Sequence, residues 1–172
     1  MSKGKSSVRV EVTSSVRSGP GVEQLSAWAS KLLRHAGAKE SSLSILLCGD
    51  RRMRGLNRSF LRKDRPTDVL SFPAREGRDG REGRGAGGSF LGDLAIDLPY
   101  AARQARRRGH PVDREVQVLL AHGILHLLGH DHETDSGEMF GLQRNLVRKA
   151  FGPGPDGLPD GAAGRGGKTV TK

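Results

Sequence analysis

The sequence predicts one α+β domain, of mixed α/β character, in which about four strands form a sheet that is covered by helices. Short apolar or alternating segments bounded by glycine and proline indicate the strands, and apolar residues at helical spacing indicate the helices. A chain of 172 residues can form one hydrophobic core of ordinary size and is too short for two such domains.

The first half of the chain predicts three strands and two helices. Val8, Val10 and Val12 alternate with polar residues, as in a half-buried strand. Apolar residues recur at helical spacing from Val22 to His35, and Gly37 follows as a stop signal. A buried strand is expected over residues 44–48 and a short helix over residues 51–60. The last strand of this half should cover residues 69–72, between two prolines.

The second half predicts one further strand and three helices. Residues 90–98 form the expected strand, and a basic helix follows over residues 100–108 and ends at Gly109. Asp113 is a candidate N-cap for a helix whose apolar residues place it deep in the domain: Val116, Leu119, Leu120, Ile124 and Leu127. Asp135 and Glu138 have the spacing of a capping box. They would open a last helix with an apolar face: Met139, Leu142, Leu146, Val147 and Ala150.

Composition divides the chain into one domain and three polar segments. We expect a flexible N-terminus over residues 1–6 and a single domain over residues 7–151. Residues 74–89 are rich in arginine and glycine and almost without apolar side chains, so they should form a mobile loop inside the domain. The glycine- and proline-rich residues 152–172 should form a disordered tail.

The charge of the chain favours a polyanionic partner. Lysine and arginine number 29 against 19 acidic residues, which gives a net charge of +10. Arginines cluster over residues 51–65 and again over residues 103–108. From these clusters we expect four residues to contact phosphates: Arg58, Arg65, Arg106 and Arg107. Aromatic residues make up only 4% of the chain, so contacts to a backbone should dominate over stacking on bases.

The apolar segments give an expectation for the compartment. No segment is long and apolar enough to span a bilayer, and the first residues lack the apolar stretch of a secretory signal. The single cysteine, Cys48, lies in an apolar run and should pack as a small buried residue. We therefore expect a cytoplasmic protein without disulfides and without membrane contact.

Three histidines form a candidate metal site. His122 and His126 are four residues apart and so project from one face of a helix, and His132 follows after five further residues. Gly129 is the residue type that ends a helix in a left-handed turn, and such a turn would bring His132 back towards the other two histidines. Three protein ligands leave a fourth position for water, as in a catalytic zinc site. Zn²⁺, one ion per chain, is therefore expected, although imidazole also suits nickel, copper and iron.

The spacing coincides with that of the metzincin proteases, with one substitution. Gly123 stands where those proteases carry a glutamate base, so the usual route of peptide hydrolysis lacks its base. His130 could replace His132 as a ligand if the helix continued beyond Gly129. Asp131 could orient a ligand histidine and is a candidate catalytic residue, or it could simply turn the chain.

Around these residues the sequence resembles the YbeY family of bacterial ribosomal RNA maturation factors. Residues 122–132 are similar to the family signature H-G-x-L-H-L-x-G-[YH]-D-H. Leu56-Asn57, Phe60, Asp64 and residues 66–73 resemble L-N-x-x-[YF]-R-x-x-D-x-P-T-D-V-L-S-F-P. Residues 91–94 resemble the family's L-G-D-I strand, and the likeness extends over residues 7 to 151.

The resemblance implies a metal-dependent endoribonuclease that cuts single-stranded RNA during ribosomal RNA maturation and ribosome biogenesis. Its substrate would be small-subunit ribosomal RNA or a precursor, with the ribosome or assembly factors as further partners. The family pattern places an arginine implied in RNA cleavage where this chain has Leu61, followed by Arg62. Either Arg62 reaches the same site as a catalytic residue, or this part of the mechanism is altered.

Two other functions stay open at the level of the sequence. Leu61 favours an RNA-binding factor of ribosome assembly whose metal is structural. A metalloprotease with a base elsewhere in the chain is the second alternative, and Gly123 argues against it.

Overall fold

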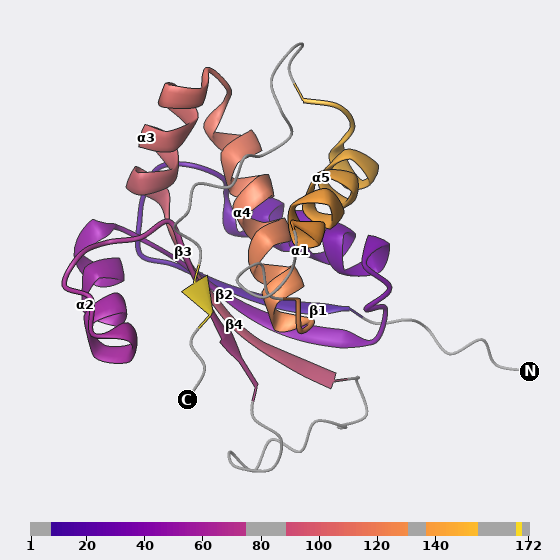
Figure 1. Ribbon diagram of the computed structural model, residues 1–172, viewed down its shortest axis with the longest axis horizontal. Helices are drawn as coiled ribbons and strands as arrows, with labels where there is room; N and C mark the ends of the chain where they lie inside the picture. Colours follow the sequence, from indigo (N-terminus) through magenta and orange to yellow (C-terminus); the bar gives the residue numbers. More distant parts are fainter. Residues whose placement is uncertain (1–7, 75–88, 131–136, 155–167, 170–172) are drawn as a thin grey trace, which may run out of the picture.

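The computed structural model describes residues 8–74, 89–130, 137–154 and 168–169. Within these residues the chain forms one sheet with helices on both of its faces (Figure 1). The strands are β1 (Arg9–Ser14), β2 (Ser41–Cys48), β3 (Val69–Pro73), β4 (Ser89–Asp97) and β5 (Lys168–Thr169). The helices are α1 (Val22–His35), α2 (Asp50–Leu61), α3 (Leu98–Arg108), α4 (Val112–Leu127) and α5 (Glu138–Phe151). No helix among these described segments is long and apolar enough to cross a membrane.

The sheet has the strand order β1-β2-β4-β3-β5. Strands β1, β2 and β4 run parallel, while β3 pairs antiparallel with β4. The four longer strands confirm the predicted α+β class and the expected strand number. Two residues of the tail, which we expected to be disordered, instead form β5 and pair with β3. The expected flexible N-terminus and almost all of the expected mobile loop fall outside the described residues.

Successive residues of the strands pack against different helices. In β2, Leu43, Ile45 and Leu47 belong to the large core formed with α1, α4 and α5. The alternate residues Leu46 and Cys48 belong to a smaller cluster with Met53 and Leu56 of α2 and with Leu70, Phe72 and Ala95 of the neighbouring strands. Because neighbouring side chains of a strand point to opposite faces, α2 covers one face of the sheet and α4 covers the other (Figure 1).

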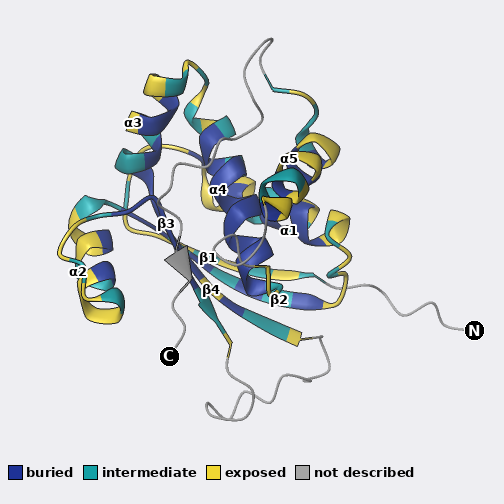
Figure 2. Cartoon of the chain, in the orientation of Figure 1, coloured by how far each residue is buried: buried dark blue, intermediate teal, exposed yellow. Residues whose placement is uncertain are grey.

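Helix α4 is the most enclosed helix of the domain. Every residue from Val118 to Leu127 is buried, and the helix is surrounded by α1, α3, α5 and the sheet (Figure 2). This confirms the expected central position. The helix begins at Val112, however, with Pro111 in the capping position, so the prediction that Asp113 is the N-cap is wrong. Asp113 instead lies in the first turn, where a negative charge is favourable to the helix dipole.

Helix α5 differs from the prediction at its start and on its inner face. It begins at Glu138 after Gly137, which has φ 94°, so Glu138 is the first residue of the helix and not the third, as the expected capping box requires. Asp135, the other member of that box, lies outside the described residues. Leu142, expected to face inward, has an exposed fraction of 42%, whereas Gln143 is fully buried.

Gly92 adapts β4 to its two neighbouring strands. The pairing of β2 with β4 shifts register at this point, because Ser42 pairs with Phe90 and Leu43 pairs with Gly92. Gly92 has φ 137°, and a Cβ atom on this residue would clash with the carbonyl oxygen of Phe72. The glycine of the L-G-D segment is therefore required by the backbone itself.

Substitution of Gly92 by alanine should lower the free energy of unfolding by about 2–4 kcal/mol, because the new methyl group meets backbone atoms that cannot move aside. Urea titration followed by circular dichroism measures this change. The control is Gly55→Ala in α2, where a Cβ atom meets nothing within 4 Å and stability should rise by about 0.5–1 kcal/mol. Equal stabilities of the two variants would contradict this account of Gly92.

Candidate metal centre on helix α4

His122 and His126 lie one turn apart near the C-terminal end of α4. Their Nε2 atoms are 3.1 Å apart, and the two rings meet edge to face at an angle of 76°. Both side chains are buried, with exposed fractions of 2% and 4%. The structure thus brings together the two histidines that the spacing predicted to share a helix face.

Gln143 of α5 holds the ring of His122. Its Oε1 atom lies 2.9 Å from His122 Nδ1 and can only accept a hydrogen bond, so Nδ1 carries the proton. The Nε2 atom of the neutral ring then keeps its lone pair and faces His126. A hydrogen bond of this kind fixes which ring nitrogen is available to a metal ion.

Gln143 was not among the site residues predicted from the sequence. A signal existed, because Gln143 lies four residues after Met139 and four before Val147, both of which are buried on the inner face of α5. A polar residue in such a row needs a buried partner, and His122 supplies it.

The distance between the two histidine nitrogens fits a shared metal ion. Two imidazoles bound tetrahedrally to zinc at about 2.0–2.1 Å have nitrogens about 3.3 Å apart, close to the 3.1 Å found here. The same distance also suits a hydrogen bond from one ring to the other when no ion is bound. His132 and Asp131 lie outside the described residues, so the structure describes two of the three expected ligands and no group of three.

Helix α4 ends where the sequence predicted. The amide of His130 bonds to the carbonyl of Leu125, and the amide of Gly129 bonds to the carbonyl of His126, both at 3.0 Å. Gly129 has φ 95°, and these two bonds together form a Schellman motif. His130 is exposed and lies past the end of the helix, so it does not continue the row of His122 and His126.

Gly123 allows α4 to approach the sheet closely. A Cβ atom on Gly123 would lie 2.7 Å from Leu94 Cδ2 and 3.4 Å from Ser71 Oγ. A glutamate at this position would place its carboxylate in the core between the helix and the sheet. The position that supplies the base in metzincin proteases is therefore a packing position here, which argues against peptide hydrolysis by that route.

The P-T-D segment of the chain forms a buried polar network rather than part of the histidine site. Asp68 accepts hydrogen bonds from the Val69 amide at 2.9 Å, from Gln104 Nε2 at 3.0 Å and from Thr67 Oγ1 at 3.2 Å. Asn57 donates to the carbonyl of Arg65 at 2.7 Å. These bonds connect the start of β3 to α3 and the end of α2, so this segment serves the fold.

The candidate phosphate-binding arginines are all exposed but occupy separate elements. Arg58 lies on α2, which covers the face of the sheet opposite to α4, and Arg65 follows that helix. Arg106 and Arg107 lie in the last turn of α3. Arg62 ends α2 in the left-handed conformation, with φ 56°, whereas Leu61 packs against the cluster beneath α2. Among the described residues, therefore, the arginines do not form a single wall around the histidines.

Cys48 does not offer an alternative reactive group. Its side chain is fully buried, and burial raises the pKa of the thiol to about 12, with a smaller contribution from the charge of Asp97. The buried thiol thus stays protonated near neutral pH and does not serve as a nucleophile.

The fold and site define a class of protein: an α+β domain whose central, buried helix presents two histidines one turn apart. A sequence profile of the family described as "Endoribonuclease YbeY" matches residues 13–150. Endoribonuclease YbeY of Solibacter usitatus is 41% identical over 142 residues, which cover 83% of this chain and 82% of that protein. Endoribonuclease YbeY of Koribacter versatilis is 40% identical over 131 residues, covering 76% and 78% of the two chains.

The fold agrees with a solved structure. The solution structure of TM1509 from Thermotoga maritima is similar with a TM-score of 0.57 and 26% identity, over 85% of this chain and 90% of that one. The chain belongs to the YbeY family.

Substitution of Gly123 by alanine should lower the free energy of unfolding by about 1–2 kcal/mol, despite the better helix propensity of alanine, because the methyl group overlaps Leu94. Replacing Leu94 by valine in the same protein removes the overlapping atoms. The double variant should therefore lose less stability than the sum of the two single variants, as measured by urea unfolding. Strictly additive losses would show that Gly123 and Leu94 do not limit the approach of α4.

Proposed function

We propose that this protein is a metal-dependent endoribonuclease that cuts single-stranded RNA during ribosomal RNA maturation and ribosome biogenesis. The observation that carries the proposal is the 3.1 Å separation of two buried imidazole nitrogens, one of which is oriented by Gln143. The relatives described as endoribonucleases support RNA as the substrate. The proposed substrate is small-subunit ribosomal RNA or its precursor in the cytoplasm, and ribosomal components are the proposed further partners.

His122, His126 and His132 would hold the metal, which we propose to be Zn²⁺. Their imidazole nitrogens suit zinc, and nickel, copper and iron share this preference. Bound there, the metal would supply a water molecule that loses its proton near neutral pH, together with a positive charge for the scissile phosphate.

The side chains of the protein would orient the metal ligands and bind the RNA. Gln143 keeps the Nε2 atom of His122 directed towards His126, and the rigid packing of α4 preserves their separation. Asp131 would orient a ligand histidine. Arg62 would serve in RNA cleavage in place of the family arginine, whose position is occupied by Leu61 here. Arg58, Arg65, Arg106 and Arg107 would neutralise phosphates away from the cut, since all four are exposed cations.

Substitution of His122 by alanine should reduce cleavage of a labelled single-stranded RNA roughly 100-fold or more, because a three-ligand site loses one ligand. Treatment of the wild-type protein with a chelator should have the same effect, and added Zn²⁺ should reverse it. The matched control is His35→Ala, which removes an exposed histidine at the end of α1 and should leave cleavage unchanged. Undiminished cutting by folded His122→Ala protein would refute the mechanism.

Replacing Gln143 by leucine should weaken Zn²⁺ binding about 10–100-fold, because the side chain keeps its volume but no longer accepts a hydrogen bond from His122. Competition with a chromogenic chelator measures the affinity without any reference to RNA cleavage. Gln143→Glu retains an acceptor and should bind zinc at least as tightly as the wild type. If the leucine variant matched the wild-type affinity, Gln143 would have no part in positioning His122.

A further inference from the structure

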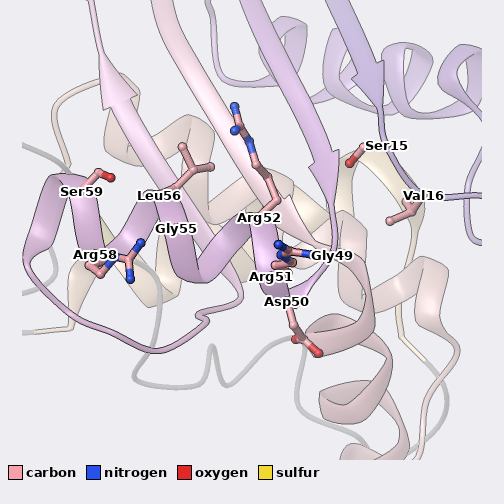
Figure 3. Close-up of a pocket in the computed structure, with 10 residues that line it drawn as sticks. All are labelled: Ser15, Val16, Gly49, Asp50, Arg51, Arg52, Gly55, Leu56, Arg58 and Ser59. Atoms are coloured by element: carbon pink, nitrogen blue, oxygen red, sulfur yellow. The ribbon is translucent and has the colours of Figure 1, made fainter.

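A groove of about 680 Å³ lies beside α2 (Figure 3). Ser15 and Val16, which follow β1, form one side, and residues of α2 with the preceding Gly49 form the other. The groove does not include His122 or His126. It is therefore a feature separate from the candidate metal centre.

The topology of the sheet explains why a groove forms here. Strands β1 and β2 are parallel neighbours, and the groove lies at their carboxyl ends. The helix that follows β1 packs on one face of the sheet, and the helix that follows β2 packs on the other. Chain segments that diverge in this way leave a crevice between them, and ligands of parallel sheets commonly bind at such a point.

The groove carries an excess of positive charge. Its one acidic side chain, Asp50, is bound by both terminal nitrogens of Arg103, at 2.6 and 3.0 Å, and this contact lowers the pKa of the carboxyl group. Arg51 and Arg52 have no ion-pair partner within the described part of the chain, and both are exposed. Arg58 also lines the groove and approaches Asp64 only to 3.8 Å, while Arg54 already binds that carboxylate.

Arg51 and Arg52 occupy an unfavourable place for cations. Both lie in the first turn of α2, at the positive end of the helix dipole, where a positive charge is unfavourable to the helix. Helices prefer acidic residues in their first turn, and a departure from this preference without a compensating ion pair is typical of a functional surface. A bound anion would supply the missing compensation.

The neutral lining fits a nucleotide unit. Ser15 and Ser59 offer hydroxyl groups, Val16 and Leu56 offer apolar surface, and no aromatic ring lines the groove. Such a lining can hold phosphate and sugar but cannot stack a base on a ring, so binding should tolerate any sequence.

We propose that this groove is a second RNA-binding site, which holds phosphodiester units of the strand that is cut at the metal centre. The inference rests on the proposed function for the identity of that strand. A free nucleotide presents the same chemistry, but the exposed cations continue past the groove through Arg62 and Arg65, which favours an extended polyanion.

The test is fluorescence anisotropy of a labelled single-stranded RNA of about 12 nucleotides, a length comparable to known single-strand sites, with full-length protein in chelator. The variant is Arg51→Gln/Arg52→Gln, and the charge-matched control is Arg34→Gln/Lys149→Gln, which alters exposed cations in the last turns of α1 and α5. The groove variant should bind on the order of 10-fold more weakly at 0.1 M salt, with the salt dependence reduced by about two phosphate contacts. The control should bind like the wild type.

Loss of affinity in the groove variant alone would support the proposal, and equal affinity of the two variants would overturn it. The second arm is a titration with adenosine monophosphate. If the wild type binds this nucleotide saturably, the groove variant loses that binding and the RNA affinity stays unchanged, the proposal is overturned and the groove is assigned to free nucleotides. The groove variant should be no less stable than the wild type, since it relieves the helix dipole. Because chelated protein is used, a failure of the proposed cleavage would leave this result unaffected.

Discussion

The contact between α4 and the sheet at Gly123 determines how the histidine pair is presented. The absence of a side chain lets the helix backbone settle against Leu94 and Ser71. Successive residues of a helix are rotated by about 100° from one another, so a helix whose Gly123 faces the sheet directs the preceding His122 towards a neighbouring helix. Gln143 of α5 meets His122 there, and His126 lies on the same face one turn later. One close approach thus fixes the site's geometry and removes the space that a protease base would need.

Much of this arrangement could be predicted because it depends on local periodicity. Helix α1 has the expected bounds, Val22–His35, since an amphipathic row followed by glycine is a strong signal. The histidine spacing predicted a shared face, and Gly129 predicted where α4 ends. The interpretation was wrong for Asp113 and Leu142, whose places depend on neighbouring elements rather than on their own segment. Gln143 and the groove itself escaped notice, because each depends on residues that are distant in the sequence: Gln143 contacts His122, and Ser15 lines the groove together with Arg52.

The motifs shared with the YbeY family separate into two kinds of residue. Gly92 is required by the path of the backbone, and Asp68 with Asn57 connects strands and helices through buried hydrogen bonds. His122 and His126, by contrast, have their Nε2 atoms directed at each other. When this chain shares a residue such as Gly92 or Asp68 with the family, the match supports a common fold. When it shares His122 and His126, the match supports common metal chemistry.

The enclosure of Cys48 has a consequence for metal selectivity. Monovalent copper is a soft ion that prefers sulfur, and a cellular protein with an accessible thiolate near a histidine site can capture it in place of a harder ion. The chain has a single cysteine, which is sealed beneath α2 and kept protonated. The imidazoles therefore meet no competing thiolate from their own chain, and discrimination between divalent ions would depend on coordination geometry and on the supply of each ion in the cell.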